Sequence, residues 1–468
     1  MKSFSNKKFL SFVFMMASVV VLSGCGWKST PQDGYKIKLE VWGVIDDTDA
    51  YGEIFSQYMR VDPYVADITY RKLSPETYKE DLIDALASGN GPDIFMIRNA
   101  WRGTFEDKIV PMPDSAVAEK FYQDSFVDVV ADDFVKESQI YGAPLSVDSL
   151  GLYYNKDLFN AAGITDPPTT WEEVLSDLNK LNRIDRLGNI NQSAIALGTA
   201  YNINRSPDIF RALLLQMGSD SEKRGETKMN LTTENARKAF EFYNQFSNIN
   251  SGTYSWNPRL HYSIDSFFEG TLGMMFNYSW RYTELQKKNA KLNFGVAPLP
   301  QFAGTAPVNL ANYWGFVVSK NKTIVPDSKT SAGKTAPVDL VKQNMLRIHE
   351  SWQLIRYLTF PHSGNTMTLK NGLTGMTKNV FLTFDPTKKY LNDTKKPAAR
   401  RDLIDEQKNS IILAPFVAGN LIARNGYQDN PEEVETILAE MIDAVNKGEK
   451  SIADALQVAT NRINILSR

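Results

Sequence analysis

A strand, a helix and a second strand follow one another near the start of the chain, and this pattern constrains the fold most. Residues 37–42 alternate apolar and polar side chains, as a half-buried strand does. Residues 74–89 begin with Ser-Pro-Glu, keep a helical spacing of apolar residues and end at a glycine. Residues 94–97 form a short apolar run that is typical of a buried strand. A unit of this kind predicts an α/β fold with a mostly parallel sheet.

Predicted strands and helices continue to alternate along the chain. Its 468 residues are enough for two lobes with separate cores. Thr170 and Glu173 have the spacing of a capping box at the start of a helix. Further strands are expected at 151–154, 194–198 and 272–276, and further helices at 231–246, 341–358, 431–446 and 451–465.

Residues 1–24 have the composition of a secretory signal peptide. They carry three lysines and no acidic residue, then an apolar run at 9–21, then small residues. The apolar run is shorter than the roughly 20 residues that a membrane-spanning helix needs. We therefore expect export and removal of this leader.

Cys25 is the only cysteine, so we expect no disulfide and a fold held by its core. Leu-Ser-Gly-Cys25 resembles the lipobox of bacterial lipoproteins, in which the cysteine is acylated and becomes the first residue. The resemblance implies a cell-membrane protein, lipid-anchored on the extracytoplasmic face (periplasmic or extracellular), with residues 25–35 as a polar tether. An ordinary signal peptide with an incidental cysteine is the alternative.

Charge and motif content argue against several function classes. With 52 basic and 54 acidic residues, and three of the basic ones in the leader, the chain lacks the basic excess that nucleic acids require. His261, His349 and His362 are not at metal-ligand spacing, so we expect no metal site and no cofactor. Carboxylate pairs such as Asp46-Asp47 are common in solvated loops. No catalytic residue is predicted, and we expect a protein that is not an enzyme.

Five phrases occur in a fixed order at 89–97, 141–164, 167–181, 267–280 and 312–320; they include GNGPDIFMI, PPTTWEEVLSDLNKL and NYWGFVVSK. Together they resemble the extracellular solute-binding proteins of bacterial ABC importers, in the carbohydrate-binding group that includes maltose-binding protein. The likeness covers nearly the whole chain after Cys25 and is weakest at 321–345 and 380–430.

The resemblance implies a two-lobed periplasmic-binding-protein type II fold, each lobe a mostly parallel sheet flanked by helices, with crossing strands between the lobes. Residues 141–148 would make the first crossing, and 293–300 would lie near the return. Both lobes are expected to be discontinuous, the N-terminal lobe comprising 36–146 and 290–340 and the C-terminal lobe 147–289 and 341–468.

Ligands of open α/β sheets collect beyond the carboxyl ends of the strands, and this rule selects the residues that follow each predicted strand. The candidate ligand-binding residues are Trp42, Asp46, Arg98, Asn99, Trp101, Asp148, Ser149, Asn277, Tyr278, Trp280, Tyr313 and Trp314, with Trp256 in a loop that could cap the cleft. Aromatic rings cover the apolar faces of a sugar, while Asp, Asn and Arg bond its hydroxyls. For any single tryptophan, packing in a core is the alternative. Arg98 would also suit an acidic sugar.

We therefore expect a monomeric, lipid-anchored protein that captures an extracellular carbohydrate, an oligosaccharide, in the cleft between its lobes. Its partners would be the sugar, the subunits of an ABC permease and, through acylated Cys25, the membrane. Two alternatives stay open: a lipid-anchored carbohydrate-active enzyme with a carboxylate pair, and a surface sensor or adhesin of the same fold.

Overall fold

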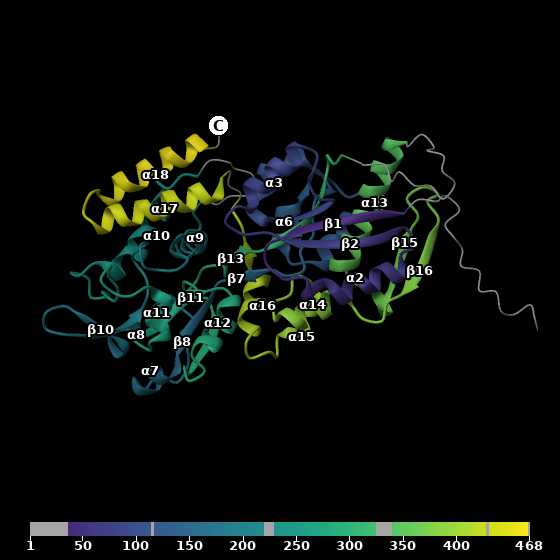
Figure 1. Cartoon of the computed structure of the whole chain (residues 1–468). Helices are drawn as coiled ribbons and strands as arrows, with labels where there is room; N and C mark the ends of the chain where they lie inside the picture. Colours follow the sequence, from purple (N-terminus) through teal and green to yellow (C-terminus); the bar gives the residue numbers. More distant parts are fainter. Residues whose placement is uncertain (1–35, 114–116, 220–228, 324–338, 427–429, 467–468) are drawn as a thin grey trace, which may run out of the picture.

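The computed structural model describes residues 36–113, 117–219, 229–323, 339–426 and 430–466. The predicted signal peptide (1–24), Cys25 and the predicted tether (25–35) lie outside the described residues. Figure 1 shows an elongated molecule with two groups of strands and helices, one around β1 and β2 and the other around β8, β10 and β11. Each group has its own sheet and its own apolar core, and we call them the N-terminal and C-terminal lobes.

The N-terminal lobe is built on a five-stranded sheet. From edge to edge its strands are β2 (Val65–Lys72), β1 (Ile37–Gly43), β3 (Ile94–Arg98), β14 (Trp314–Ser319) and β4 (Ile109–Val110). Strand β1 is parallel to β2 and β3, whereas β14 runs antiparallel to both of its neighbours. The parallel half of the sheet is the strand–helix–strand unit expected from the sequence.

Helices and two hairpins complete this lobe. Tyr51 and Tyr58 of α2 are fully buried, and Trp352 and Ile355 of α13 pack into the same core. The helices are α2 (Asp49–Val61), α3 (Tyr78–Ala87), α4 (Arg102–Phe105), α5 (Glu119–Ser125), α6 (Asp128–Phe134), α13 (Leu340–Thr359), α14 (Pro386–Thr394) and α15 (Arg401–Gln407), and the hairpins are β5–β6 (Val135–Lys136, Gln139–Ile140) and β15–β16 (Thr366–Lys370, Thr377–Phe381).

The C-terminal lobe has a second five-stranded sheet. Its order is β12 (Phe294–Pro298), β8 (Gly151–Asn155), β11 (Leu272–Asn277), β10 (Ile190–Ile195) and β9 (Arg183–Ile184). Only the central pair, β10 and β11, is parallel. The covering helices are α7 (Lys156–Ala161), α8 (Trp171–Leu181), α9 (Ser206–Gln216), α10 (Glu234–Asn244), α11 (Ser263–Phe268), α12 (Trp280–Lys288), α17 (Pro431–Asn446) and α18 (Ile452–Leu466).

Local signals in the sequence mark several of these helices. The capping box at α8 is confirmed: Thr170 accepts from the Glu173 backbone N–H, and the Glu173 carboxylate accepts from that of Thr170. Helix α17 has the predicted bounds. Helix α3 begins at Tyr78 instead of near Ser74, and residues 75–77 form a turn before it.

A three-stranded sheet joins the lobes. Strand β13 (Asn309–Asn312) pairs antiparallel with β7 (Asp148–Ser149) and parallel with β17 (Ala423–Arg424), and α16 (Ala414–Leu421) packs against β7. Figure 1 shows β7 and β13 in the middle of the molecule. The chain therefore passes between the lobes at three places, and we call this sheet the hinge.

The expected lobe boundaries are wrong in two segments. Residues 294–298 form β12, which pairs with β8 in the C-terminal sheet, so the chain returns at β13 and not near 293–300. Helices α13 to α15 pack into the N-terminal core, although 341–468 was assigned to the other lobe. An amphipathic pattern shows which face of a segment is buried, but it does not show which of two cores buries that face.

The two-lobed α/β fold class is confirmed, but the sheets are less parallel than expected. Strands β8 and β12 are antiparallel to their neighbours, and so is β14. Buried strands of either direction have the same apolar run, so this pattern does not report direction. Among the described residues, no helix combines the length and the apolar character that crossing a bilayer requires.

Candidate ligand-binding site at the lobe interface

The carboxyl ends of β3 and β11 lead into residues that meet beside the hinge. Tyr278, directly after β11, donates its hydroxyl hydrogen to Asp208 at 2.9 Å and also receives a hydrogen bond from Asn312 of β13. Two residues after Asn312 comes Trp314, which lies opposite Arg98 at the end of β3. Residues of both lobes thus lie on either side of β13 in the hinge.

Trp280 is the most open aromatic residue of this set. Its side chain begins α12, is 45% exposed and stacks on Tyr278 with ring centres 4.7 Å apart. Arg205 lies with its guanidinium 5.3 Å from the centre of the Tyr278 ring and pairs with Asp208. Trp280 therefore offers an indole surface that is supported from beneath and free to pack against a ligand.

Three aromatic residues form the corresponding surface of the N-terminal lobe. Half-buried Trp314 meets buried Trp101 edge to face, with ring centres 5.1 Å apart, and both rings contact Tyr78. Lys79 lies 5.3 Å from the centre of the Trp101 ring. Of the predicted residues, Trp314 and Trp280 are thus the two tryptophans beside the hinge that retain exposed ring surface.

Arg98 is engaged by two carboxylates from the opposite lobe. Its guanidinium bonds Glu432 at 3.3 Å and Glu435 at 3.1 Å, both on α17. Glu432 also accepts from Lys79 at 2.8 Å and from the indole N–H of Trp101. Burial alone would raise the pKa of Glu432, but the bonds from Lys79 and Trp101 outweigh it, and the net direction is down.

A second polar cluster follows β1. Asp46 accepts from Tyr390 at 2.6 Å and from Tyr51 at 3.3 Å, and it forms an ion pair with Lys396. Burial lowers the pKa of Lys396, and Asp46 opposes that change. The carboxylate of Asp148 in the hinge also acts on Lys396, so this cluster connects the N-terminal lobe to β7.

Asp148 is a buried carboxyl group within the hinge. It accepts from the backbone N–H and hydroxyl of Ser279, at 3.0 and 2.5 Å, and from the Ser149 N–H at 2.9 Å. Burial raises its pKa to about 7, even though these hydrogen bonds favour the ionised form. Asp148 holds the start of α12, and with it Trp280, against the hinge.

Asn99 and Tyr313 belong to a structural cluster around Asp133. The hydroxyl of Tyr313 donates to Asp133 at 2.6 Å, and the amide of Asn99 donates at 3.2 Å. Asn425, just after β17, donates at 3.4 Å. Burial raises the pKa of Asp133 to about 7. These predicted residues therefore hold strand ends together through Asp133.

Four other predicted residues lie in the interior. Trp256, expected in a loop over the cleft, is fully buried in the C-terminal core and donates its indole N–H to Asn202 at 3.0 Å. Trp42 is in the N-terminal core, and its indole donates to Glu40 at 2.7 Å. The remaining two, Ser149 and Asn277, are fully buried and bonded to the Phe416 carbonyl and to Asn204.

Sequence reasoning missed most of the charged residues of the interface. Glu432 and Glu435 belong to an ordinary amphipathic helix, and Lys396 and Asp208 come from segments with no strand-end signal. In the sequence, only Arg98 indicated such a contact, because a half-buried cation at a strand end needs an acidic partner. The partner is more than 330 positions away in the chain.

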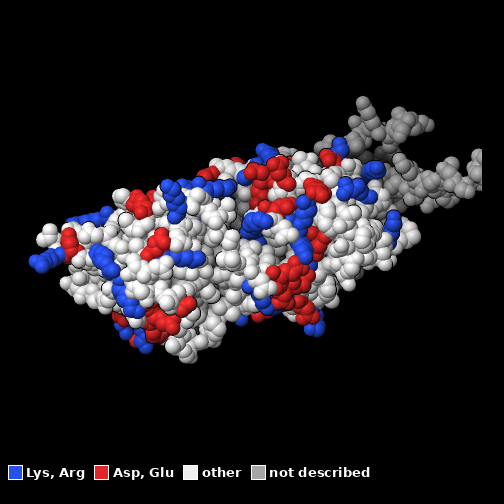
Figure 2. Space-filling view, turned by 90° about the horizontal axis from the view of Figure 1, so that it is seen from below, with Lys and Arg blue, Asp and Glu red and all other residues white. Residues whose placement is uncertain are grey.

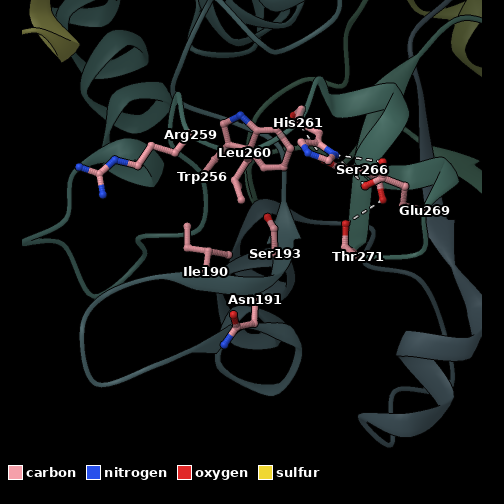
Figure 3. Close-up of a pocket in the computed structure, with 10 residues that line it drawn as sticks. All are labelled: Ile190, Asn191, Ser193, Trp256, Arg259, Leu260, His261, Ser266, Glu269 and Thr271. Atoms are coloured by element: carbon pink, nitrogen blue, oxygen red, sulfur yellow. Dashed lines mark hydrogen bonds and ion pairs between the residues drawn. The ribbon is translucent and has the colours of Figure 1, made fainter.

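A separate cavity of about 230 Å³ lies in the C-terminal lobe, and Figure 3 shows its lining. It opens near Ile190 and Thr271, at the amino ends of β10 and β11, away from the hinge. His261 and Glu269 pair across its rim at 3.0 Å. Strand-end chemistry therefore favours the lobe interface over this cavity. Within the described ranges, no cluster of three or more His, Cys, Asp or Glu side chains could hold a metal ion.

These features define a two-lobed binding-protein fold with a candidate polar and aromatic site at the hinge, and solved structures share the fold. The sugar-binding protein MalE from Xanthomonas citri matches with a TM-score of 0.70 at 18% identity, over 92% of this chain and 97% of that one. The cyclic alpha-maltosyl-1,6-maltose binding protein from Arthrobacter globiformis matches with a TM-score of 0.68 at 18% identity, over 92% and 99%.

The family model described as bacterial extracellular solute-binding protein matches residues 48–325, which is more than half of the chain. The chain belongs to this family, and the predicted family is confirmed. The maltotriose-binding protein of Pyrococcus abyssi is 23% identical over 271 residues, 56% of this chain and 53% of that protein. The chain spans about half the length of the curated relatives it matches. The family description places its members outside the cytoplasm.

Proposed function

We propose that this protein captures a carbohydrate, of oligosaccharide length, between its lobes and delivers it unchanged to an ABC permease. The observation that carries the proposal is the exposed Trp280 ring, stacked on Tyr278 beside the hinge. Tyr278 is hydrogen-bonded to Asn312, and Trp314 follows two residues later at the N-terminal lobe. Rings on both sides of a hinge are suited to the two apolar faces of a sugar. The names of the similar proteins, which include maltodextrin-type binders, support the same ligand class.

The charges at the interface favour a neutral sugar over an acidic one. Arg98 is paired with Glu432 and Glu435, and Arg205 is paired with Asp208. A carboxylate ligand would have to displace these acidic groups, whereas sugar hydroxyls can add to their remaining lone pairs. An uncharged carbohydrate therefore fits the site with less electrostatic cost.

Lipid anchoring through Cys25 is part of the proposal and rests on the Leu-Ser-Gly-Cys sequence. Its test is metabolic labelling with a fatty-acid analogue in cells that process lipoproteins, with Cys25→Ser as the control. We expect label and membrane fractionation for the wild type and neither for the variant. Label on both chains, or on neither, contradicts the anchor.

The ligand proposal is tested by isothermal calorimetry against a panel of neutral maltose-type and other oligosaccharides, with uronic-acid oligomers as the charged comparison. We expect micromolar or tighter binding of at least one neutral oligosaccharide. Chromatography of the mixture should recover the sugar intact, and cleavage would favour the enzyme alternative. Absence of heat with every sugar, for a chain shown to be folded by circular dichroism, contradicts carbohydrate binding.

Delivery to a permease distinguishes a transport receptor from a sensor or adhesin. Cells that lack this protein should lose uptake of the radiolabelled sugar identified by calorimetry. Unchanged uptake with normal binding in vitro would support the sensor or adhesin reading.

A further inference from the structure

The first turns of α17 reach across from the C-terminal lobe to the N-terminal lobe. Glu432 and Glu435 are three positions apart and face the same way, toward Arg98, Lys79 and Trp101. Glu433, between them in the sequence, is exposed. Figure 1 shows the beginning of α17 beside the N-terminal lobe near α3.

The rest of α17 belongs firmly to the C-terminal lobe. Val434, Ile437 and Leu438 are buried in the C-terminal core, and the helix packs along α18 and α9. The partners of the two glutamates are equally fixed in the other lobe, because Trp101 and Tyr78 are part of the N-terminal core. Any rotation that separates the lobes at this point must stretch or break the contacts of both glutamates.

The Arg98–Glu435 pair is less exposed than an ordinary surface ion pair, whereas the side chain of Glu432 is 43% exposed. The Arg98 side chain is 18% exposed and that of Glu435 is 25% exposed, so water screens them only in part. Glu432 accepts from three groups, one of which is the indole N–H of buried Trp101. Losing Glu432 would leave the indole N–H of Trp101 without its acceptor, and losing either carboxylate would leave Arg98 with one partner fewer.

We propose that Glu432 and Glu435 are positioning residues that hold the lobes at the spacing of this structure, which we call the closed arrangement, and fix Trp101 and Arg98 beside the candidate ligand site. They set ligand affinity without contacting the sugar. The part that concerns affinity rests on the proposed function, whereas the part that concerns lobe spacing does not. If the closed arrangement is the one that binds, then apparent affinity falls in proportion to the population of that arrangement.

The test compares Glu432→Gln/Glu435→Gln with Glu433→Gln, which removes a charge from the same turns of the same helix. Glutamine keeps the size and helix propensity of the side chain, and circular dichroism checks that each variant is folded. In small-angle X-ray scattering without sugar, we expect the double variant to have a larger radius of gyration than the wild type and the Glu433→Gln control. Lys79→Gln removes the N-terminal-lobe partner of Glu432 and should also increase the radius of gyration.

For the oligosaccharide that binds the wild type, we expect the double variant to bind about 5- to 10-fold more weakly, with the loss mainly in the dissociation rate. Raising salt from 0.05 to about 0.5 M should open the wild type and leave the double variant unchanged. Identical radii and salt responses for the double variant and Glu433→Gln overturn the proposal. If no sugar binds any form, the proposed function fails, yet the scattering result still decides the role of the two glutamates.

Discussion

Trp280 and Trp256 show that one residue type takes opposite positions in this fold. Both follow polar or small residues in loops, and both were candidates for ligand contact. Trp256 is fully buried and hydrogen-bonded to Asn202, whereas Trp280 begins a helix and keeps 45% of its surface exposed. The difference arises because Asp148 binds Ser279 and thereby holds the first turn of α12 at the hinge.

Replacing Trp280 with alanine should weaken oligosaccharide binding and leave folding intact. The indole is stacked on Tyr278 but is not part of a core, so its loss removes ligand contact surface without a cavity. We expect the dissociation constant to rise about 10-fold or more, as for a central aromatic contact. Phe121→Ala, a residue of similar exposure that contacts Phe360 in the N-terminal lobe, is the control. Equal affinities of the two variants in calorimetry would contradict the assignment of Trp280.

Asp148 makes the stability of the protein depend on pH. Its pKa is raised by burial from the ordinary 3.8 to about 7, so the native state binds more protons than the unfolded state between these values. Stability from this group is therefore complete below about pH 4 and is lost as the pH rises through 7, by at most about 4 kcal/mol.

The measurement is urea unfolding at pH 5 and pH 8 for the wild type, Asp148→Asn and the exposed control Asp67→Asn. Asparagine cannot ionise, so its variant should lose less stability than the wild type on going from pH 5 to pH 8. The control on β2 should behave as the wild type does. An Asp148→Asn variant with the full wild-type decline would show that the hinge carboxyl does not cause it.

At the scale of elements, α16 lies so close to the hinge that it requires a glycine. A Cβ on Gly419 would lie 2.3 Å from the Ser149 hydroxyl oxygen and 2.8 Å from the Asn309 amide nitrogen. Neither neighbour can move freely, because Ser149 bonds the Phe416 carbonyl and Asn309 bonds the backbone of Leu150. The close approach connects α16 to β7 and β13.

Gly419→Ala should therefore destabilise the protein by about 1–3 kcal/mol through overpacking. The matched control is Gly52→Ala in α2, where an added Cβ would have no heavy atom within 4 Å. There, alanine should stabilise the helix by up to about 1 kcal/mol. Thermal and urea unfolding give both values, and the same sign for both substitutions would contradict the packing argument at α16.

At the scale of the molecule, the three chain crossings allow the lobes to rotate about one small sheet. Figure 2 shows, on the face seen from below, charged side chains of both signs gathered toward the middle of the molecule, while the C-terminal lobe has broad uncharged areas. Mixed charge at a lobe boundary favours contacts that can form and break in water, unlike a continuous apolar interface.

Ligand binding should increase the population of the closed arrangement and stabilise both lobes together. At a free oligosaccharide concentration of 100 times the dissociation constant, we expect about 2.7 kcal/mol of added stability. Small-angle scattering should report a smaller radius of gyration with the sugar than without it. A stabilised protein of unchanged radius would show that the sugar binds one lobe alone.

The strand–helix–strand unit, the capping box of α8 and the bounds of α17 follow from the sequence alone, because near neighbours in the chain decide them. The family resemblance could also be recognised from the sequence, in the five phrases that surround strand ends. Only the tertiary structure decided that α13 to α15 join the first core, that Trp256 is buried and that Glu432 meets Arg98. Contacts between residues hundreds of positions apart depend on how whole elements pack. A local pattern of apolar and polar residues does not determine that packing.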